Sequence, residues 1–232
     1  MTARDGVRVT TADAYLPIEA TPAGLTVLAD TLVSEIVVRA GTAEGVRLPD
    51  GRVLGAALVV LCAGVYGAPA VLMRSGIGPA AHLAELGVPV VADLPGVGSN
   101  LADHPQVWLD PGYGRPAQER PPSHLLATFR SSFCGAGQSP DLGPPTDLST
   151  SDRVRAWIGQ ERYSIPHTIG TCAMGDRPES GSVIDAHGKV HGIDRLAVID
   201  ASIIPLPPSG FPHILAIMIA ERLSSHLAHT TA

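Results

Sequence analysis

The segment Leu58–Ala63 is an unbroken run of apolar residues that ends at Gly64. A short run of this kind, bounded by glycine, is typical of a strand buried on both faces of a sheet. Helix signals follow it in the chain. Ala68–Arg74 has the composition of a helix, and Pro79 and Gly87 mark the start and the end of the next one. A buried strand followed by helices predicts the α/β fold class.

Further elements are predicted from β-branched content, helical spacing and turn residues. The predicted strands cover residues 25–29, 35–39, 88–91 and 196–199, a hairpin covers 46–54, and helices cover 151–160 and 213–228. Residues 94–105 are predicted to form a glycine-rich loop, and His167 is expected in a loop as well. Residues 110–150 are crowded with proline and glycine, which predicts a loop or linker.

Composition excludes several classes of protein. The chain has 232 residues, 45% of them hydrophobic and 16% charged, and a formal charge of -6 without a cluster of lysine or arginine. These values argue for a folded core and against a nucleic-acid binder. The longest apolar run near the C-terminus, Ile214–Ala220, is far shorter than the roughly 20 residues of a membrane span.

The three cysteines are widely spaced and lack CxxC spacing, so neither a disulfide framework nor a zinc site is indicated. Reduced thiols predict a cytoplasmic location, and the N-terminus lacks the apolar region of a signal peptide. His104, His187 and His191 lack the spacing of metal ligands and are expected on the surface or in loops. No metal site is therefore predicted.

Two histidines flank a strand that ends in a carboxylate. His167 lies in Pro166–Gly175, before a glycine turn, and His213 ends the segment Pro208–His213. Between them the predicted strand ends at Asp200, followed by Ala201. Taken alone, His167 is compatible with a buried structural histidine and Asp200 with a cap at the end of a strand. A neutral imidazole can nevertheless accept a proton near neutral pH, as a general base must.

Considered together, these segments resemble the C-terminal end of the glucose–methanol–choline (GMC) family of flavin oxidoreductases. Ala68–Pro79 is similar to the family's second signature, and both Cys62–Gly64 and Asn100–Pro105 follow the family's order and spacing. The resemblance implies part of a Rossmann-like FAD-binding domain. It also implies oxidation of the CH–OH group of a small-molecule alcohol by hydride transfer to flavin N5, with His167 and His213 as the acid–base pair.

The same resemblance implies which residues contact FAD. The positions carried over are Val33 against the adenine, Ala63 and Gly64 beside the nucleotide, and Asp200 and Ala201 under the ribityl chain and pyrophosphate. A carboxylate suits hydroxyl groups, and free backbone N–H groups suit phosphate oxygens.

The chain departs from the family in two places. The GxGxxG loop that holds the FAD pyrophosphate is not found, and the substrate-domain sheet is reduced to residues 110–150. The expected organisation is a partial FAD-binding domain at 1–109, a shortened substrate-domain remnant at 110–150 and a C-terminal segment at 151–232 that completes the FAD domain. The alternative is a non-catalytic fragment, or one half of a split enzyme that needs a complementary N-terminal chain to bind FAD.

Overall fold

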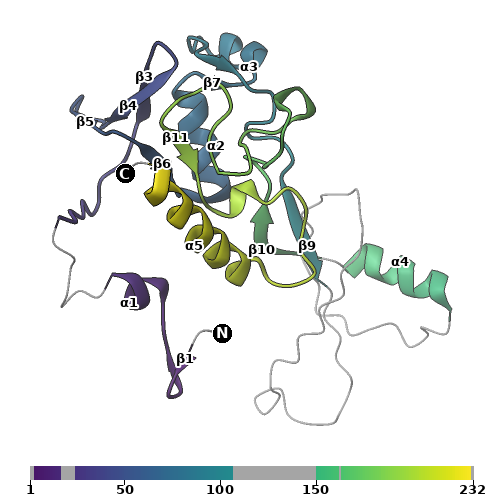
Figure 1. Ribbon diagram of the computed structural model, residues 1–232. Coiled ribbons are helices and arrows are strands. Elements are labelled where there is room, and N and C mark those ends of the chain that lie inside the picture. The colour runs from purple at the N-terminus through teal and green to yellow at the C-terminus, as the bar shows by residue number, and fades with distance from the viewer. Residues whose placement is uncertain (1–2, 17–23, 107–149, 162, 231–232) are drawn as a thin grey trace. The chain divides into compact units, whose positions relative to one another are not determined.

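The computed structural model describes residues 3–16, 24–106, 150–161 and 163–230 (Figure 1). The chain divides into two compact units, Met1–Leu32 and Val33–Ala232, and each is considered by itself. The predicted loop at 110–150 lies outside the described residues except for its last residue.

The first unit contains β1 (Ala3–Arg4) and β2 (Val7–Arg8), which form an antiparallel pair, and helix α1 (Thr11–Tyr15). Thr10 caps α1 through reciprocal hydrogen bonds with Asp13. The predicted strand at residues 25–29 is wrong: this stretch is irregular, and Val27 is 66% exposed. β-Branched residues favour a strand only where a neighbouring strand and a covered face receive them.

The second unit holds the remaining elements. Its strands are β3 (Glu35–Arg39), β4 (Thr42–Arg47), β5 (Val53–Gly55), β6 (Val59–Leu61), β7 (Ile77–Gly78), β8 (Ala92–Asp93), β9 (Ala102–Gln106), β10 (Tyr163–Ile169) and β11 (Leu196–Val198). Its helices are α2 (Gly64–Arg74), α3 (Ala80–Glu85), α4 (Ser151–Glu161) and α5 (Pro212–Thr230), with 3-10 turns η3 (Pro178–Ser180) and η4 (Ala201–Ile203). The fold is α/β, as the sequence predicts.

Strands β6 and β11 are far apart in the sequence but pair in parallel, Val59 with Leu196 and Leu61 with Val198. Their carboxyl ends therefore meet at one edge. The prediction that the first of these strands is buried on both faces is wrong, because Val60 is 39% exposed while Val59 and Leu61 are each 7% exposed. Among the described residues, β11 is the one strand that pairs with β6.

Helix α2 starts four residues earlier than predicted, at Gly64. Pro69 lies inside the helix and has no N–H to donate to the carbonyl of Val65, one turn back. The hydroxyl of Thr171 donates to that carbonyl instead, at 2.5 Å. A proline can therefore stand inside this helix because a distant residue supplies the missing donor, which no local signal reveals.

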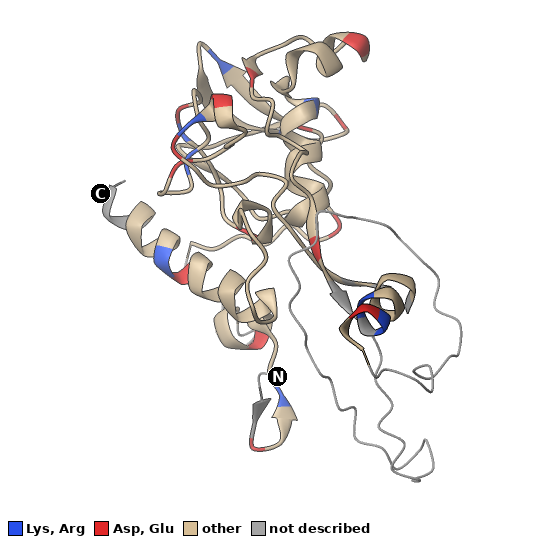
Figure 2. Cartoon of the chain, turned by 90° about the vertical axis from the view of Figure 1, so that its right-hand side faces the viewer, with Lys and Arg blue, Asp and Glu red and all other residues tan. Residues whose placement is uncertain are grey.

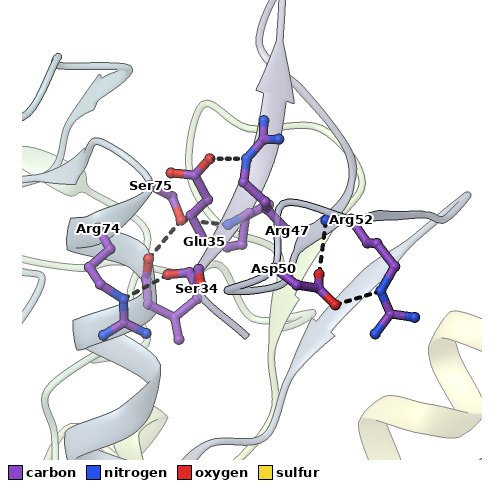
Figure 3. A network of polar contacts seen from close by, with 9 residues as sticks. Ser34, Glu35, Arg47, Asp50, Arg52, Arg74 and Ser75 are labelled. Atoms are coloured by element: carbon purple, nitrogen blue, oxygen red, sulfur yellow. Dashed lines mark hydrogen bonds and ion pairs between the residues drawn. The ribbon is translucent and has the colours of Figure 1, made fainter. Parts of the chain in front are cut away.

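The sheet β3–β4–β5 is attached to the end of α2 by polar contacts (Figure 3). The hydroxyl of Ser75 accepts from the backbone nitrogen of Ile36 at 2.7 Å and donates to the carbonyl of Val71 at 2.7 Å. Arg74 donates to the carbonyl of Ser34 at 2.7 Å. The predicted hairpin is confirmed as β4 and β5, which pair antiparallel.

Two predictions near the middle of the chain and one around His167 are wrong. The strand expected at 88–91 is not formed there; strand β8 begins at Ala92. The carbonyl of Gly76 accepts hydrogen bonds from the backbone nitrogens of Val91 and Ala92, where β7 and β8 begin to pair. The loop expected at 94–105 changes into strand β9 at Ala102, and the expected loop around His167 is strand β10. These two strands pair antiparallel. Each strand supplies the backbone hydrogen-bond partners of the other, from a segment about sixty residues away in the sequence.

The hydrophobic core of this unit lies between α2 and the β6–β11 pair. Its most deeply buried members include Leu72, Ile77, Ile184, Leu196 and Val198, each at most 1% exposed. Full burial of such a side chain contributes about 1.5–3 kcal/mol relative to an exposed one. The core thus fixes the edge at which β6 and β11 end.

Charged residues are scattered over the described elements rather than gathered on one of them (Figure 2). Within the described ranges, no helix combines the length and the apolar character that crossing a membrane requires.

Candidate active site

His167 lies in a bulge of the β9–β10 pair. Ile165 pairs with His104 and Ile169 pairs with Ala102, so three residues of β10 lie opposite Asp103 alone. A bulge of this kind breaks the hydrogen-bond ladder and turns a side chain in a direction that regular pairing would not allow. Pro166, which has no N–H, is next to His167 within it.

The side chain of Asp103 replaces the backbone partners that the bulge removes. Its Oδ1 accepts from the backbone nitrogen of His167 at 3.0 Å and from that of His104 at 2.7 Å, and its Oδ2 accepts from the hydroxyl of Ser164. One carboxylate therefore fixes β9 and β10 to each other at the point where His167 is presented. Charged acceptors make stronger bonds of this type than neutral ones do.

The ring of His104 lies next to that of His167. The two ring centroids are 5.7 Å apart in an edge-to-face arrangement. His104 is 3% exposed, which corrects the expectation of a surface or loop histidine. Its Nε2 lies 2.8 Å from the carbonyl oxygen of Pro208, in the segment that leads to α5. The Nδ1 atoms of both histidines are buried and have no hydrogen-bond partner in the part of the chain that the structure describes.

Burial lowers the pKa of His167 below its usual value, and the neighbouring His104 lowers this pKa further. The carboxylate of Asp103 acts in the opposite direction. The net result favours a neutral imidazole near neutral pH. A neutral imidazole is able to accept a proton from a molecule that reaches its ring.

His213, the partner expected from the sequence, is the second residue of α5 and is exposed. The ring contacts of His167 are instead with His104 and with Phe211, whose centroid lies 4.8 Å away. Phe211 comes two residues before His213, so the start of α5 lies close to the His167 ring. The sequence analysis missed His104 and Phe211 as members of this cluster. The only sequence signal for His104 was its place directly after Asp103.

Four of the predicted cofactor residues come together where β6 and β11 end. Asp200 caps η4 by accepting from the backbone nitrogen of Ser202 at 2.7 Å, and its other oxygen accepts from the backbone nitrogen of Gly64 at 2.9 Å. Ala63 and Ala201 are the next residues on either side of this bridge. The carboxyl ends of parallel strands are the usual binding edge of an open α/β sheet.

Val33 lies apart from this group. Its carbonyl accepts from Nη2 of Arg74 at 3.2 Å, at the C-terminal end of α2, whereas Gly64 begins the same helix. A helix of this length separates the two ends by roughly 15 Å. The predicted contacts therefore form two groups, one at each end of α2.

The residues at the β6–β11 edge suit the hydroxyl-rich part of FAD. Asp200 is a carboxylate with acceptor positions beyond its two backbone bonds, and a Cβ built on Gly64 would meet nothing within 4 Å, so there is open space beside the backbone. The backbone nitrogen of Gly64 already donates to Asp200. This nitrogen is therefore not available to a phosphate oxygen of FAD.

Cys172 is fully buried in the core, and burial raises the pKa of its thiol to about 12. A thiol with such a pKa stays protonated and unreactive. His187 is exposed, while His191 is partly buried and its Nε2 lies 2.9 Å from the carbonyl of Gly175. Among the described residues, no group of three or more His, Cys, Asp and Glu side chains is placed to hold a metal ion.

The sequence matches two family models, both described as GMC oxidoreductase, over residues 1–106 and 129–220. Together the two models cover most of the chain. This chain belongs to the GMC oxidoreductase family. Membership in this family supports FAD as the cofactor.

Named relatives include an uncharacterised GMC-type oxidoreductase encoded in the thcA 5' region of Rhodococcus erythropolis, which is 28% identical and covers 96% of this chain. An oxygen-dependent choline dehydrogenase of Escherichia coli O157:H7 is 24% identical and covers 94%. The chain spans 60% and 59% of the lengths of these two GMC relatives. The first match extends over 298 positions although this chain has 232 residues, so the relative carries residues within that span that this chain lacks.

Solved structures share the fold. A pyridoxine 4-oxidase from Mesorbium loti gives a TM-score of 0.70 at 24% identity, with 98% of this chain and 63% of that one covered. A formate oxidase variant from Aspergillus oryzae RIB40 gives a TM-score of 0.60 at 18% identity, covering 84% of this chain and 59% of the other. At these identities the likeness concerns the fold of this GMC chain.

Proposed function

We propose that this chain carries the acid–base site of a FAD-dependent GMC enzyme that oxidises the CH–OH group of a small-molecule alcohol. The observation that carries the proposal is the placement of His167. It lies in a bulge fixed by Asp103, and burial holds its pKa below the usual value. These are the properties of a general base that works near neutral pH.

In the proposed reaction, the imidazole of His167 takes the hydroxyl proton of the alcohol. FAD, when bound at this site, would supply the acceptor for the hydride that leaves the carbinol carbon. The two electrons of the broken O–H bond then form the second bond of the carbonyl group, and the product is an aldehyde or ketone. His213, at the first turn of α5, is proposed to complete the pair as a hydrogen-bond partner for the substrate oxygen.

Asp200 and Ala201 are proposed to lie under the ribityl chain of FAD, and Ala63 and Gly64 beside the nucleotide. The hydrogen bond from Gly64 to Asp200, at the ends of β6 and β11, supports a shared site for these residues. Val33 is proposed to contact the adenine through its backbone. The assignment of Val33 depends on the family resemblance, because its carbonyl already receives Arg74.

A second candidate function is that of one half of an enzyme completed by a complementary chain, or of a fragment without activity. The observation that favours it is the free edge of β6, where Val60 is 39% exposed and, among the described residues, no further strand pairs. A strand from another polypeptide could pair with this edge. A cytoplasmic location remains a prediction.

Titration of the purified full chain with FAD, followed by visible absorption and flavin fluorescence, separates the two candidates. Saturable binding, with reduction of the bound flavin by a panel of primary and secondary alcohols, is expected for the first. His167→Ala should bind FAD with unchanged affinity and lose nearly all flavin reduction, by about 10²–10⁴-fold. His191→Ala is the matched control, because His191 is also a partly buried histidine bonded to a backbone carbonyl.

Unchanged reduction in the His167→Ala variant would remove this residue from the mechanism. A chain that takes up no FAD would exclude the first candidate for this polypeptide alone. Recovery of FAD binding on addition of the N-terminal, GxGxxG-containing segment of a GMC relative would then establish the second.

A further inference from the structure

The short segment from Asn100 to His104 contacts both sides of the proposed acid–base site. At its C-terminal end, Asp103 fixes the backbone of His167 in β10. His104 reaches in the other direction, to Pro208, and Asn100 donates to the carbonyl of Pro205 at 3.2 Å. Both prolines belong to the loop at residues 204–211, which connects η4 to α5.

We propose that His104 is a positioning residue of this site: its hydrogen bond to Pro208 holds the loop at residues 204–211 against β9, so that Phe211 stays on the ring of His167 and α5 begins at a fixed place. The inference rests on the proposed role of His167, but its test below does not need turnover.

The tautomer of His104 follows from its partner. A backbone carbonyl only accepts hydrogen bonds, so the Nε2 atom, 2.8 Å from the oxygen of Pro208, must carry a hydrogen. In the neutral ring this leaves Nδ1 with a lone pair. That Nδ1 is buried and has no partner. The neutral ring therefore donates one hydrogen bond, from Nε2 to the loop, and has no second N–H to donate to His167.

The hydrogen bond is well placed to control the loop. His104 is 3% exposed. Within the loop, Ile204 is buried but Leu206 is 75% exposed, so the loop has little apolar burial beyond its first residue. Phe211 is 50% exposed and meets the ring of His167 edge-on at 4.8 Å. Loss of the hydrogen bond from His104 in β9 to Pro208 should let the loop open locally, because segments with few buried contacts open at a low free-energy cost. Phe211 would then leave His167 uncovered.

Two variants that both carry a side-chain amide separate the effect of the hydrogen bond to Pro208 from the effect of packing by the His104 ring. In His104→Gln the side-chain amide nitrogen can take the place of Nε2 and keep the bond to Pro208. In His104→Asn the amide is one methylene shorter and cannot reach it. Both variants lose the imidazole ring, so a difference between them reports the bond to Pro208. His191→Asn is the control at a remote site, since it also removes a ring nitrogen that contacts a backbone carbonyl.

The measurement is exchange of the imidazole Cε1 hydrogen for deuterium in the full chain, resolved for each histidine by peptide mass spectrometry. His104→Asn is expected to speed exchange at His167 by about tenfold, the change that follows when loss of one buried hydrogen bond raises the population of the open loop. His104→Gln should exchange at His167 within about twofold of the unmodified chain, on the scale set by a retained bond. His191→Asn should leave His167 unchanged.

Equal acceleration in the Gln and Asn variants would overturn the proposal, since the ring alone would then matter. An effect of His191→Asn on His167 would overturn it as well, because a general loss of stability would explain the result. If the unmodified chain shows no alcohol oxidation while the exchange pattern is as expected, the proposed function fails and the positioning role of His104 stands.

Discussion

The carboxylate of Asp103 and the backbone nitrogen of His167 are joined by a 3.0 Å hydrogen bond across a β-bulge. The bond replaces a ladder contact that the bulge removes. It also places a negative charge beside the imidazole, which opposes the lowering of the pKa of His167 by burial. The position and the proton affinity of His167 therefore depend on the same side chain.

Replacing Asp103 should separate these two effects. Asp103→Asn keeps one oxygen for the backbone nitrogens of His104 and His167, but it removes the charge. The pKa of His167 should fall further, with the fold retained, and NMR titration of the imidazole would detect this. Asp103→Ala loses every one of these bonds and should lower the free energy of unfolding by about 1–3 kcal/mol in urea titrations.

Asp185→Asn is the matched control for Asp103, because Asp185 also accepts from the backbone nitrogens of a histidine and a second residue, His187 and Lys189. It should leave the pKa of His167 where it is. A pKa of His167 that rises in Asp103→Asn would contradict the role assigned to the charge.

The stability of the chain should depend on pH through His167. Burial lowers its pKa in the folded state, so between that pKa and about 6.5 the unfolded state binds more protons. The free energy of unfolding should therefore fall as the pH is lowered from about 6.5 through the folded pKa. Above about 6.5 this loss of stability through His167 should be absent. Urea titrations of the chain and of His167→Gln across this range test the prediction. The variant should show a shallower decrease, and equal slopes would refute it.

Gly170 should not tolerate a side chain. It follows β10 with φ +96°, and a Cβ there would lie 2.3 Å from the carbonyl oxygen of Asn100. Gly170→Ala should cost clearly more than the roughly 1–2 kcal/mol of a left-handed backbone alone. Gly192→Ala is the control, since Gly192 has φ +75° and open space around it. Thermal unfolding of both variants decides the point: equal losses would show that Asn100 yields without cost.

Thr171 and Pro69 should be energetically coupled. Thr171→Val leaves the carbonyl of Val65 without its donor and should cost about 1–3 kcal/mol. In a Pro69→Ala background, the new N–H of residue 69 can donate to Val65, so the same substitution should cost much less. A double-mutant cycle measured by urea unfolding gives the coupling energy. A cycle that closes at zero would show that the two donors do not replace one another.

Much of the fold could be predicted because its signals are local. Val59–Leu61 and Leu196–Val198 are short apolar runs that end at small or acidic residues, and α5 has helical spacing over most of its length. The β4–β5 turn is specified by Pro49, Asp50 and Gly51, whose preferences act within four residues. Helix α2 was misplaced at its start because the tolerance for Pro69 depends on Thr171, about a hundred residues away.

The candidate site was only partly visible in the sequence. Gly64 and Asp200 were both assigned to FAD by the family resemblance, and the hydrogen bond between them shows that they lie together. His167 was identified by its motif, but as a loop residue. The bulge that presents it, the burial of His104 and the contact with Phe211 arise from pairing between β9 and β10 and from the loop at residues 204–211. None of these three features can be recognised in a single segment of the sequence.

The sequence by itself determined the α/β class, the family and the types of residue available for acid–base chemistry, because apolar runs, turn residues and motif order are properties of neighbouring positions. The tertiary structure alone decided which of the described histidines is buried beside another, which carbonyl accepts its hydrogen bond, and that Val60 of β6 remains exposed. The physical reason is that burial and hydrogen-bond partners are set by segments far apart in the chain, and these fix both the pKa of His167 and the place of its neighbours.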